Sequence, residues 1–108
     1  MVPFMKKAMI VQPMNGLSDD EIKTKREEVK KVLESKGYSV MNSFFDYSED
    51  KLKSFGYNNL GIFYLSESLK VMSMCDAIYC CKGWDQARGC TIEHQVAEFY
   101  GLEIVYES

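Results

Sequence analysis

The sequence lacks a long apolar run, and this absence limits the kinds of protein it can be. No stretch approaches the roughly 18 consecutive apolar residues that a membrane-spanning helix needs. The first ten residues contain two lysines but no extended apolar stretch before a small-residue cleavage site, so they lack the pattern of a secretory leader. We therefore expect a soluble, cytoplasmic protein that has no membrane partner.

An excess of positive charge is also missing. Lysine and arginine number 13 against 16 aspartates and glutamates, which gives a formal net charge of −3. Proteins that bind the phosphate backbone usually carry a basic surplus, so we do not expect a nucleic-acid polymer as partner, whereas small anionic ligands are compatible with this charge. The 108 residues, of which 46% are hydrophobic, predict one globular domain over residues 1–108.

The patterns of a metal site are absent as well. His94 is the only histidine, and the cysteines do not form the paired Cys-x-x-Cys spacing of a zinc site. Cys80 and Cys81 are adjacent, and adjacent residues of a strand point to opposite faces, so these two thiols would not converge on one metal. We expect Cys75, Cys80, Cys81 and Cys90 to be reduced and mostly buried, and we expect neither a metal nor a cofactor.

The segments that are present alternate between strands and helices. The predicted strands are residues 7–12, 38–42, 77–81 and 102–106. The first predicted helix begins at the capping box of Ser18 and Glu21 and ends at Gly37, a second precedes the third strand, and a third covers residues 90–100. Strands that alternate with helices at this spacing predict a mostly parallel, doubly wound sheet of four to five strands in a three-layer α/β domain.

The helices also carry patterns that predict their buried faces. The apolar residues at helical spacing are Ile22, Val29, Val32 and Leu33 in the first helix, Ile62, Leu65, Leu69 and Met72 in the second, and Ile92, Val96 and Phe99 in the third. The alternating charges of the first helix are interpreted as a solvated face with no further role.

Ligands of doubly wound sheets bind beyond the carboxyl ends of the strands, which predicts a site formed by residues 13–18, 42–45 and 82–93. Seven of the fourteen aromatic residues lie between Phe44 and Tyr64, in a stretch without clean periodicity that we expect to be a long loop with a short helical turn. These rings can supply a stacking surface or a lid for a planar ligand. The alternative, which we favour for most of them, is that they cover the sheet edge or a subunit contact.

The strongest chemical pattern is the loop between Gly83 and Gly89 that leads into the last helix. The amides of a first helical turn are free to bind phosphate or hydroxyl groups, and Gly89 lets a ligand come close. Glu93 is expected in this first turn, where its carboxylate can attack an electrophilic sugar carbon. The alternative is that Glu93 only complements the helix dipole.

Several short motifs together resemble one known group of proteins. They are Pro13-Met14-Asn15-Gly16-Leu17, Gly37-Tyr38-Ser39-Val40 with Asn42, and Cys75-Asp76-Ala77-Ile78 leading to Gly83-Trp84-x4-Gly89-x3-Glu93-x3-Ala97. Their order and spacing are similar to the nucleoside 2-deoxyribosyltransferase-like superfamily, and most similar to its short DUF4406 branch. The resemblance implies a flavodoxin-like domain in which Glu93 attacks the anomeric carbon of a (deoxy)nucleoside or its 5′-monophosphate, and a second base or water resolves the glycosyl ester.

The resemblance also implies the roles of other residues. The superfamily's acidic positions are Ser68 and Ala87 here, so Glu67 and Asp85 are the candidate acids that act beside Glu93. Arg88 is a candidate partner of a 5′-phosphate. The residues expected to bind substrate are Gln12, Pro13, Met14, Asn15, Gly16, Asn42, Phe45, Gly83, Trp84, Arg88, Gly89 and Thr91.

Two functions from different classes are compatible with these residues. The first is an enzyme that hydrolyses or transfers the N-glycosidic bond of a small-molecule nucleoside or nucleotide, and Glu93 in its glycine loop favours it. The second is a non-catalytic nucleotide-binding or oligomeric scaffold protein of the same fold, which Ser68 and Ala87 favour. Because a small domain covers its sheet edges thinly, we expect a homodimer or a higher homo-oligomer.

Overall fold

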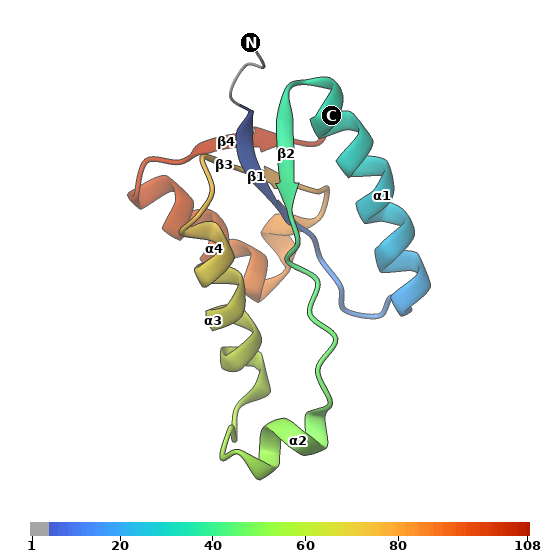
Figure 1. Cartoon of the computed structure of the whole chain (residues 1–108), viewed down its shortest axis with the longest axis vertical. Coiled ribbons are helices and arrows are strands. Elements are labelled where there is room, and N and C mark those ends of the chain that lie inside the picture. Colours follow the sequence, from blue (N-terminus) through green and yellow to red (C-terminus); the bar gives the residue numbers. More distant parts are fainter. Residues whose placement is uncertain (1–4) are drawn as a thin grey trace.

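Four parallel strands form the centre of the computed structural model, which describes residues 5–108 (Figure 1). The strands are β1 (Lys6–Val11), β2 (Tyr38–Met41), β3 (Ala77–Cys80) and β4 (Glu103–Tyr106), in the order β2-β1-β3-β4. Neighbouring strands are parallel in every pair, and the register places Ala8 opposite both Val40 and Ala77. The predicted doubly wound sheet is confirmed, with four strands in the described part of the chain.

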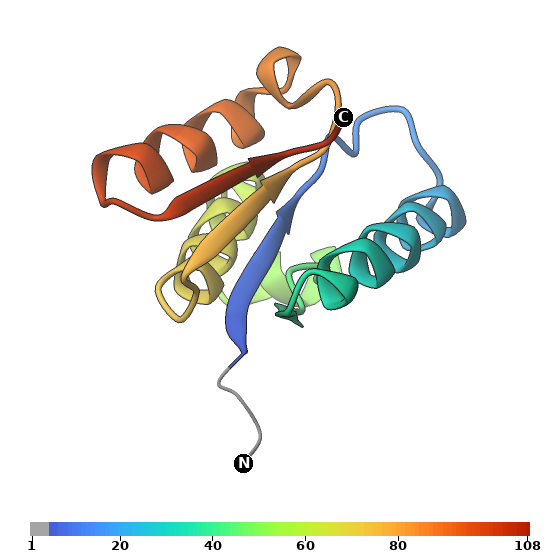
Figure 2. The same cartoon turned by 90° about the horizontal axis from the view of Figure 1, so that it is seen from above.

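Helices cover both faces of the sheet (Figure 2). Helix α1 (Asp19–Ser35) covers one face, where Val29 and Leu33 pack on Ala8 and Ile10. Helices α3 (Leu60–Met72) and α4 (Arg88–Phe99) cover the other face, and their buried residues Val71, Met72, Cys90 and Ala97 pack on Met9, Val11, Ile78 and Cys80. This arrangement confirms the predicted three-layer, flavodoxin-like architecture.

The expected state of the cysteines is also confirmed. All four are free thiols, of which Cys75 is half-buried and the others are buried. Cys80 packs on the face covered by α3 and α4, whereas Cys81 packs on the face covered by α1. The two adjacent thiols therefore point to opposite sides of the sheet, as the alternation along a strand requires.

Helix α1 begins at the capping box expected from the sequence. The Ser18 hydroxyl accepts a hydrogen bond from the Glu21 backbone N–H at 3.1 Å, and the Glu21 carboxylate accepts one from the Ser18 backbone N–H at 3.1 Å. Of the predicted apolar face, Ile22, Val29 and Leu33 are buried, but Val32 is 41% exposed. The prediction for Val32 was wrong because a neighbouring residue on a helix is rotated by about 100° from the buried stripe.

The apolar patterns of α3 and α4 were also partly wrong. Ile62 is 64% exposed whereas Phe63 is buried, because the first half of α3 extends beyond the sheet (Figure 1). In α4, Ile92 and Phe99 are exposed, and Val96 packs against the core beside the fully buried Ala97. Helical spacing predicted that these segments are helices, but the side that meets the sheet depends on where each helix lies.

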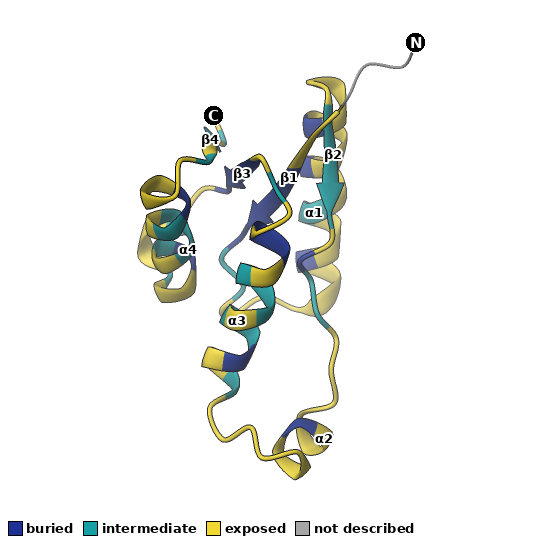
Figure 3. Cartoon of the chain, turned by 60° about the vertical axis from the view of Figure 1, so that its left-hand side comes forward, coloured by how far each residue is buried: buried dark blue, intermediate teal, exposed yellow. Residues whose placement is uncertain are grey.

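The segment between β2 and α3 forms an arm that projects from the domain. It contains the short helix α2 (Glu49–Ser54), which agrees with the predicted helical turn. The arm gives the molecule principal dimensions of 47 × 29 × 28 Å, and Figure 3 shows that α2 is mostly exposed. Among residues 5–108, none of the helices combines the length and apolar character that crossing a bilayer requires.

Candidate functional site

A cavity of about 1040 Å³ lies where the carboxyl ends of the strands meet the arm. Its volume is at the upper end of the range typical of small-molecule sites. The sequence-predicted residues that line it are Gln12, Pro13, Met14, Asn15, Phe45, Gly83, Arg88, Gly89 and Glu93. The structure therefore brings together the loop after β1, the segment after β2 and the glycine loop after β3.

Two of the candidate acids lie outside this cavity. Neither Glu67 nor Asp85 is among the described residues that line it. Glu67 instead forms an ion pair with Lys70 on α3 at 3.4 Å, and Asp85 is exposed in the 3-10 turn Trp84–Gln86. Ser68, on the same helix as Glu67, does line the cavity.

Four further predicted residues also lie outside the lining. Trp84 stacks on His94 with 4.0 Å between ring centroids and an interplanar angle of 16°. The Asn42 side chain hydrogen-bonds the backbone of Phe44, and the Thr91 hydroxyl donates to the Arg88 carbonyl at 2.7 Å. Gly16 occupies the turn before α1 with φ of +81°, a conformation that favours glycine.

Glu93 projects into the cavity from the second turn of α4. Helix α4 begins at Arg88, two residues earlier than predicted, so Glu93 is not in the first turn, which has no acidic residue. Because the dipole interaction falls off within the first turn, the dipole-complementing role is disfavoured.

Burial raises the pKa of Glu93 to about 7, although the nearby Arg26 guanidinium acts in the opposite direction. A half-buried carboxyl group with such a pKa exchanges its proton near neutral pH.

The start of α4 is open toward a ligand. Its N-cap residue Ala87 lines the cavity and provides no side-chain hydrogen bond to the first turn. The first backbone N–H groups of an uncapped helix lack partners in the helix and attract negatively polarised groups. The exposed side chain of Arg88 adds a positive charge at the same end.

Arg26 contacts two residues that line the cavity, and the sequence interpretation missed it. Its Nη1 donates to the Ser43 Oγ at 2.9 Å, the Ser43 hydroxyl donates to the Ile10 carbonyl at 3.1 Å, and the guanidinium lies 5.9 Å from the centre of the Phe44 ring. The prediction that the charges of α1 form only a solvated face is wrong for Arg26. The spacing of residues 22, 26, 29 and 33 places Arg26 on the buried stripe, and this signal was available in the sequence.

Aromatic rings form the wall of the cavity on the side of the arm. Phe45 and Tyr47 stack with 6.2 Å between centroids at 7°, and Tyr47 and Tyr64 stack with 6.3 Å at 27°. All three line the cavity, so part of the aromatic segment faces the candidate site, while Phe55 is 79% exposed at the far end of the arm. Burial, together with the nearby Glu49 carboxylate, raises the pKa of Tyr64.

Gln12 contributes a buried polar group at the end of β1. Its side chain is 6% exposed, and its Nε2 donates to the Ile22 carbonyl at 3.4 Å. Its Oε1 has no hydrogen-bond partner among the described residues. Buried polar atoms are almost always paired, so this oxygen marks a place that is completed by water or a ligand.

Together, the fold and the cavity define a small doubly wound α/β protein with a candidate ligand site at the carboxyl edge of its sheet. The chain belongs to the DUF4406 family, described as a domain of unknown function, whose sequence profile matches residues 6–106. No curated protein matches the chain.

Proposed function

We propose that the protein binds a nucleoside or nucleoside 5′-monophosphate in this cavity and hydrolyses or transfers its N-glycosidic bond with Glu93 as the nucleophile. The observation that carries the proposal is the half-buried Glu93 carboxyl group, which shares the cavity with the open start of α4 and with an aromatic wall. The resemblance to the nucleoside 2-deoxyribosyltransferase-like superfamily supports the same chemistry.

The proposed reaction has two balanced steps. A Glu93 carboxylate oxygen forms a bond to the anomeric carbon while the carbon–nitrogen bond breaks, and its electron pair leaves with the base, which takes up a proton. Water or a second base then attacks the same carbon and displaces the carboxylate. Displacement by water yields the free sugar, whereas displacement by a base yields a new nucleoside.

The shape and charge of the cavity suggest how the substrate is oriented. A nucleobase would stack on the rings of Tyr47 and Tyr64. A 5′-phosphate would accept hydrogen bonds from the free N–H groups at the start of α4 and would pair with Arg88. The sugar would then lie between these two ends, within reach of Glu93.

The direct test is to incubate the purified protein with a panel of ribo- and deoxyribonucleosides and their 5′-monophosphates, and to measure free base by chromatography. We expect base to be released from at least one panel member in excess over the protein. Adding a second base to the same mixture distinguishes transfer from hydrolysis, because transfer produces a new nucleoside. If no substrate releases base between pH 6 and pH 9, an interval of about one pH unit or more on either side of the Glu93 pKa, the proposed reaction is wrong.

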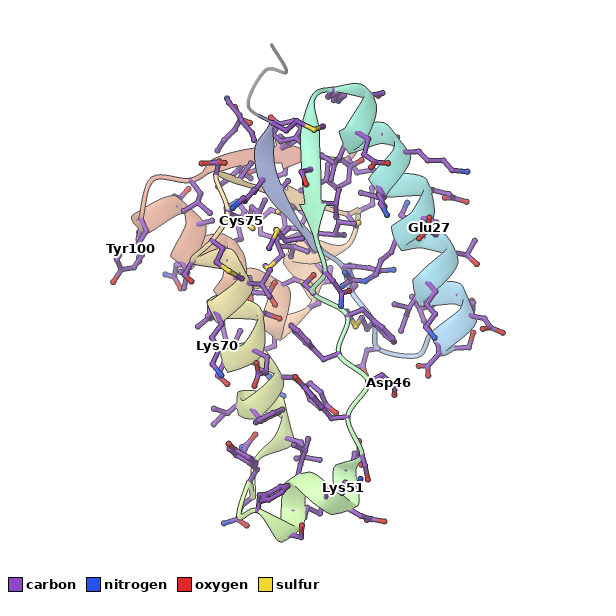
Figure 4. The ribbon with its side chains drawn as sticks, viewed as in Figure 1. Glu27, Asp46, Lys51, Lys70, Cys75 and Tyr100 are labelled. Carbon is purple, nitrogen blue, oxygen red and sulfur yellow. The ribbon has the colours of Figure 1, made fainter. Side chains whose placement is uncertain are left out.

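Glu49 is the acidic residue best placed to assist the departing base. It is the first residue of α2, it lines the cavity, and its carboxylate raises the pKa of Tyr64, as that of Asp46 also does. Asp46 also lines the cavity, but its side chain points from the arm toward the side of α1 (Figure 4). We therefore assign the role beside the base to Glu49, in preference to Glu67 and Asp85.

Replacing Glu49 by glutamine should slow base release by about 100-fold, the usual contribution of a positioned acid. The matched control is Asp50→Asn, which removes one negative charge from the next residue of α2, outside the cavity lining. The control should release base within about two-fold of the wild-type rate. Equal rates for the Glu49→Gln variant and the wild type would exclude this role for Glu49.

A second candidate function is a non-catalytic nucleotide-binding module. The observation that favours it is Ser68, which occupies the cavity where the superfamily's transferases have an acid. A nucleotide that raises the melting temperature of the protein without releasing base would identify such a module. The expected cytoplasmic location and homo-oligomeric state apply to both functions and stay predictions.

A further inference from the structure

Arg26 carries a largely buried positive charge that has no ion-pair partner in the described part of the chain. Its only hydrogen bond there is the one from Nη1 to the Ser43 hydroxyl, and its Nε is buried without a partner. A buried cation is costly unless a negative charge lies nearby. A negative charge near Arg26 therefore lowers this cost, and among the described residues that line the neighbouring cavity Glu93 is the one carboxylate that is not exposed.

The contacts of Arg26 place this charge directly behind the cavity wall. Ser43, which accepts its hydrogen bond, and Phe44, whose ring it approaches, both line the cavity that contains Glu93. We infer that Arg26 is a positioning residue for the proposed reaction, and that its buried guanidinium favours the carboxylate form of Glu93 that the attack requires. This inference rests on the proposed function, because it assigns Arg26 a role in that reaction.

The other titratable groups around Glu93 do not replace Arg26 in this role. The thiols of Cys80 on β3 and Cys90 on α4 face Glu93, but burial raises both thiol pKa values to about 12, so they are neutral at pH 7.

Arg88 is exposed to solvent at the start of α4, where its charge is screened. The remaining charged groups of the cavity are the carboxylates of Asp19 on α1, Asp46 in the connecting segment and Glu49 on α2, and these oppose a second negative charge.

His94 and Tyr64 do not replace Arg26 in favouring the carboxylate form of Glu93 either. His94 follows Glu93 on α4, but it turns away from the cavity, stacks on Trp84 and lies 2.7 Å from the Tyr106 hydroxyl. The Tyr64 hydroxyl, on α3, has a raised pKa and is neutral at pH 7. Arg26 is thus the cation that acts on Glu93 from the side away from solvent.

The test is an NMR titration of the Glu93 carboxyl carbon in the free protein, compared between the wild type and three variants. Arg26→Gln should raise the Glu93 pKa by about one pH unit. Arg26→Lys keeps the positive charge, so its Glu93 pKa should stay close to the wild-type value. The matched control is Lys23→Gln, which removes an exposed cation of the same helix that also lies 5.5 Å from the centre of the Phe44 ring. The control should titrate as the wild type does.

An unchanged Glu93 pKa in Arg26→Gln, or an equal rise in Lys23→Gln, would overturn the inference. If Arg26→Gln alone does not fold at pH 8, the double variant Arg26→Gln with Glu93→Gln should fold, because it removes the carboxylate that lost its partner; failure of both would show a purely structural role. The titration uses no substrate, so it separates this inference from the proposed function. A protein that shows the Arg26 effect but releases no base would refute the reaction alone.

Discussion

Replacing Glu93 by glutamine is expected to abolish base release while making the folded protein more stable at alkaline pH. Glutamine has nearly the same shape as glutamate but is not a nucleophile, so the proposed reaction should slow by at least about 1,000-fold. A residue that serves only the fold would show the opposite stability effect. Activity and stability measured on one variant therefore distinguish a functional carboxylate from a structural one.

The stability effect follows from the titration of Glu93. Burial raises its pKa from the ordinary 4.5 to about 7, so between these values the folded protein retains a proton that the unfolded chain has released. The stabilisation from this proton is fully present below about pH 4.5 and is lost as the pH rises through about 7. At 1.36 kcal/mol per pH unit, the loss is about 3 kcal/mol, and the glutamine variant does not incur it.

Urea unfolding of both proteins at pH 4.5 and pH 8 measures this difference. The variant should gain about 3 kcal/mol over the wild type between the two pH values, because all other titrating groups are shared. Glu98→Gln on the exposed side of the same helix is the control and should change by less than about 0.5 kcal/mol. A Glu93→Gln variant that is less stable than the wild type at pH 8 would show that the carboxylate supports the fold.

Local signals were sufficient to predict which segments form strands and helices, although α4 begins two residues earlier than expected. The Ser18 and Glu21 capping box fixed the start of α1, and Gly37 and Gly101, with φ of +91° and +76°, mark the turns after α1 and α4. Such turns are determined by the few residues that form them, so the local sequence is enough to predict them. Local signals did not predict the exposed side of α3. Ile62 is exposed because this part of the helix extends beyond the sheet, and the position of the helix depends on the whole fold.

The candidate site shows the same limit. The topology rule correctly placed the cavity at the carboxyl ends of the strands, and Gln12, Gly83 and Glu93 line it. Trp84 does not, because Gly83 turns the chain with φ of +88° and directs the next side chain toward His94. Neighbours in the sequence can thus face opposite sides of a loop, which motif spacing does not reveal.

The buried position of Arg26 could have been predicted from its spacing in the sequence. A run of alternating charges on a helix is usually solvated, and most of α1 follows this rule. Only the register with Ile22, Val29 and Leu33 distinguishes Arg26, and its partner Ser43 is 17 residues away. The hydrogen bond across that distance depends on the packing of α1 beside the end of β2.

The pH dependence of base release separates two chemical roles of Glu93. As a nucleophile it acts in its carboxylate form, so the rate should rise about tenfold per pH unit below pH 7 and level off above it, as expected for a group with a pKa of about 7. The rate at pH 5 should be about 100-fold below that at pH 8. The measurement is the initial rate of base release at substrate concentrations well below KM, where the pH profile reports groups of the free protein, in buffers from pH 5 to pH 9.

Unfolding at low pH would imitate this profile, but the contribution of Glu93 to stability has the opposite sign. Its protonated form stabilises the folded protein, so the fall in rate toward pH 5 should occur while the circular dichroism spectrum is unchanged. The Arg26→Gln variant should shift the rising limb toward higher pH by about one unit, whereas Lys23→Gln should not. A rate that instead falls as the pH rises through 7 would make the protonated Glu93 carboxyl the donor to the departing base, and water the nucleophile.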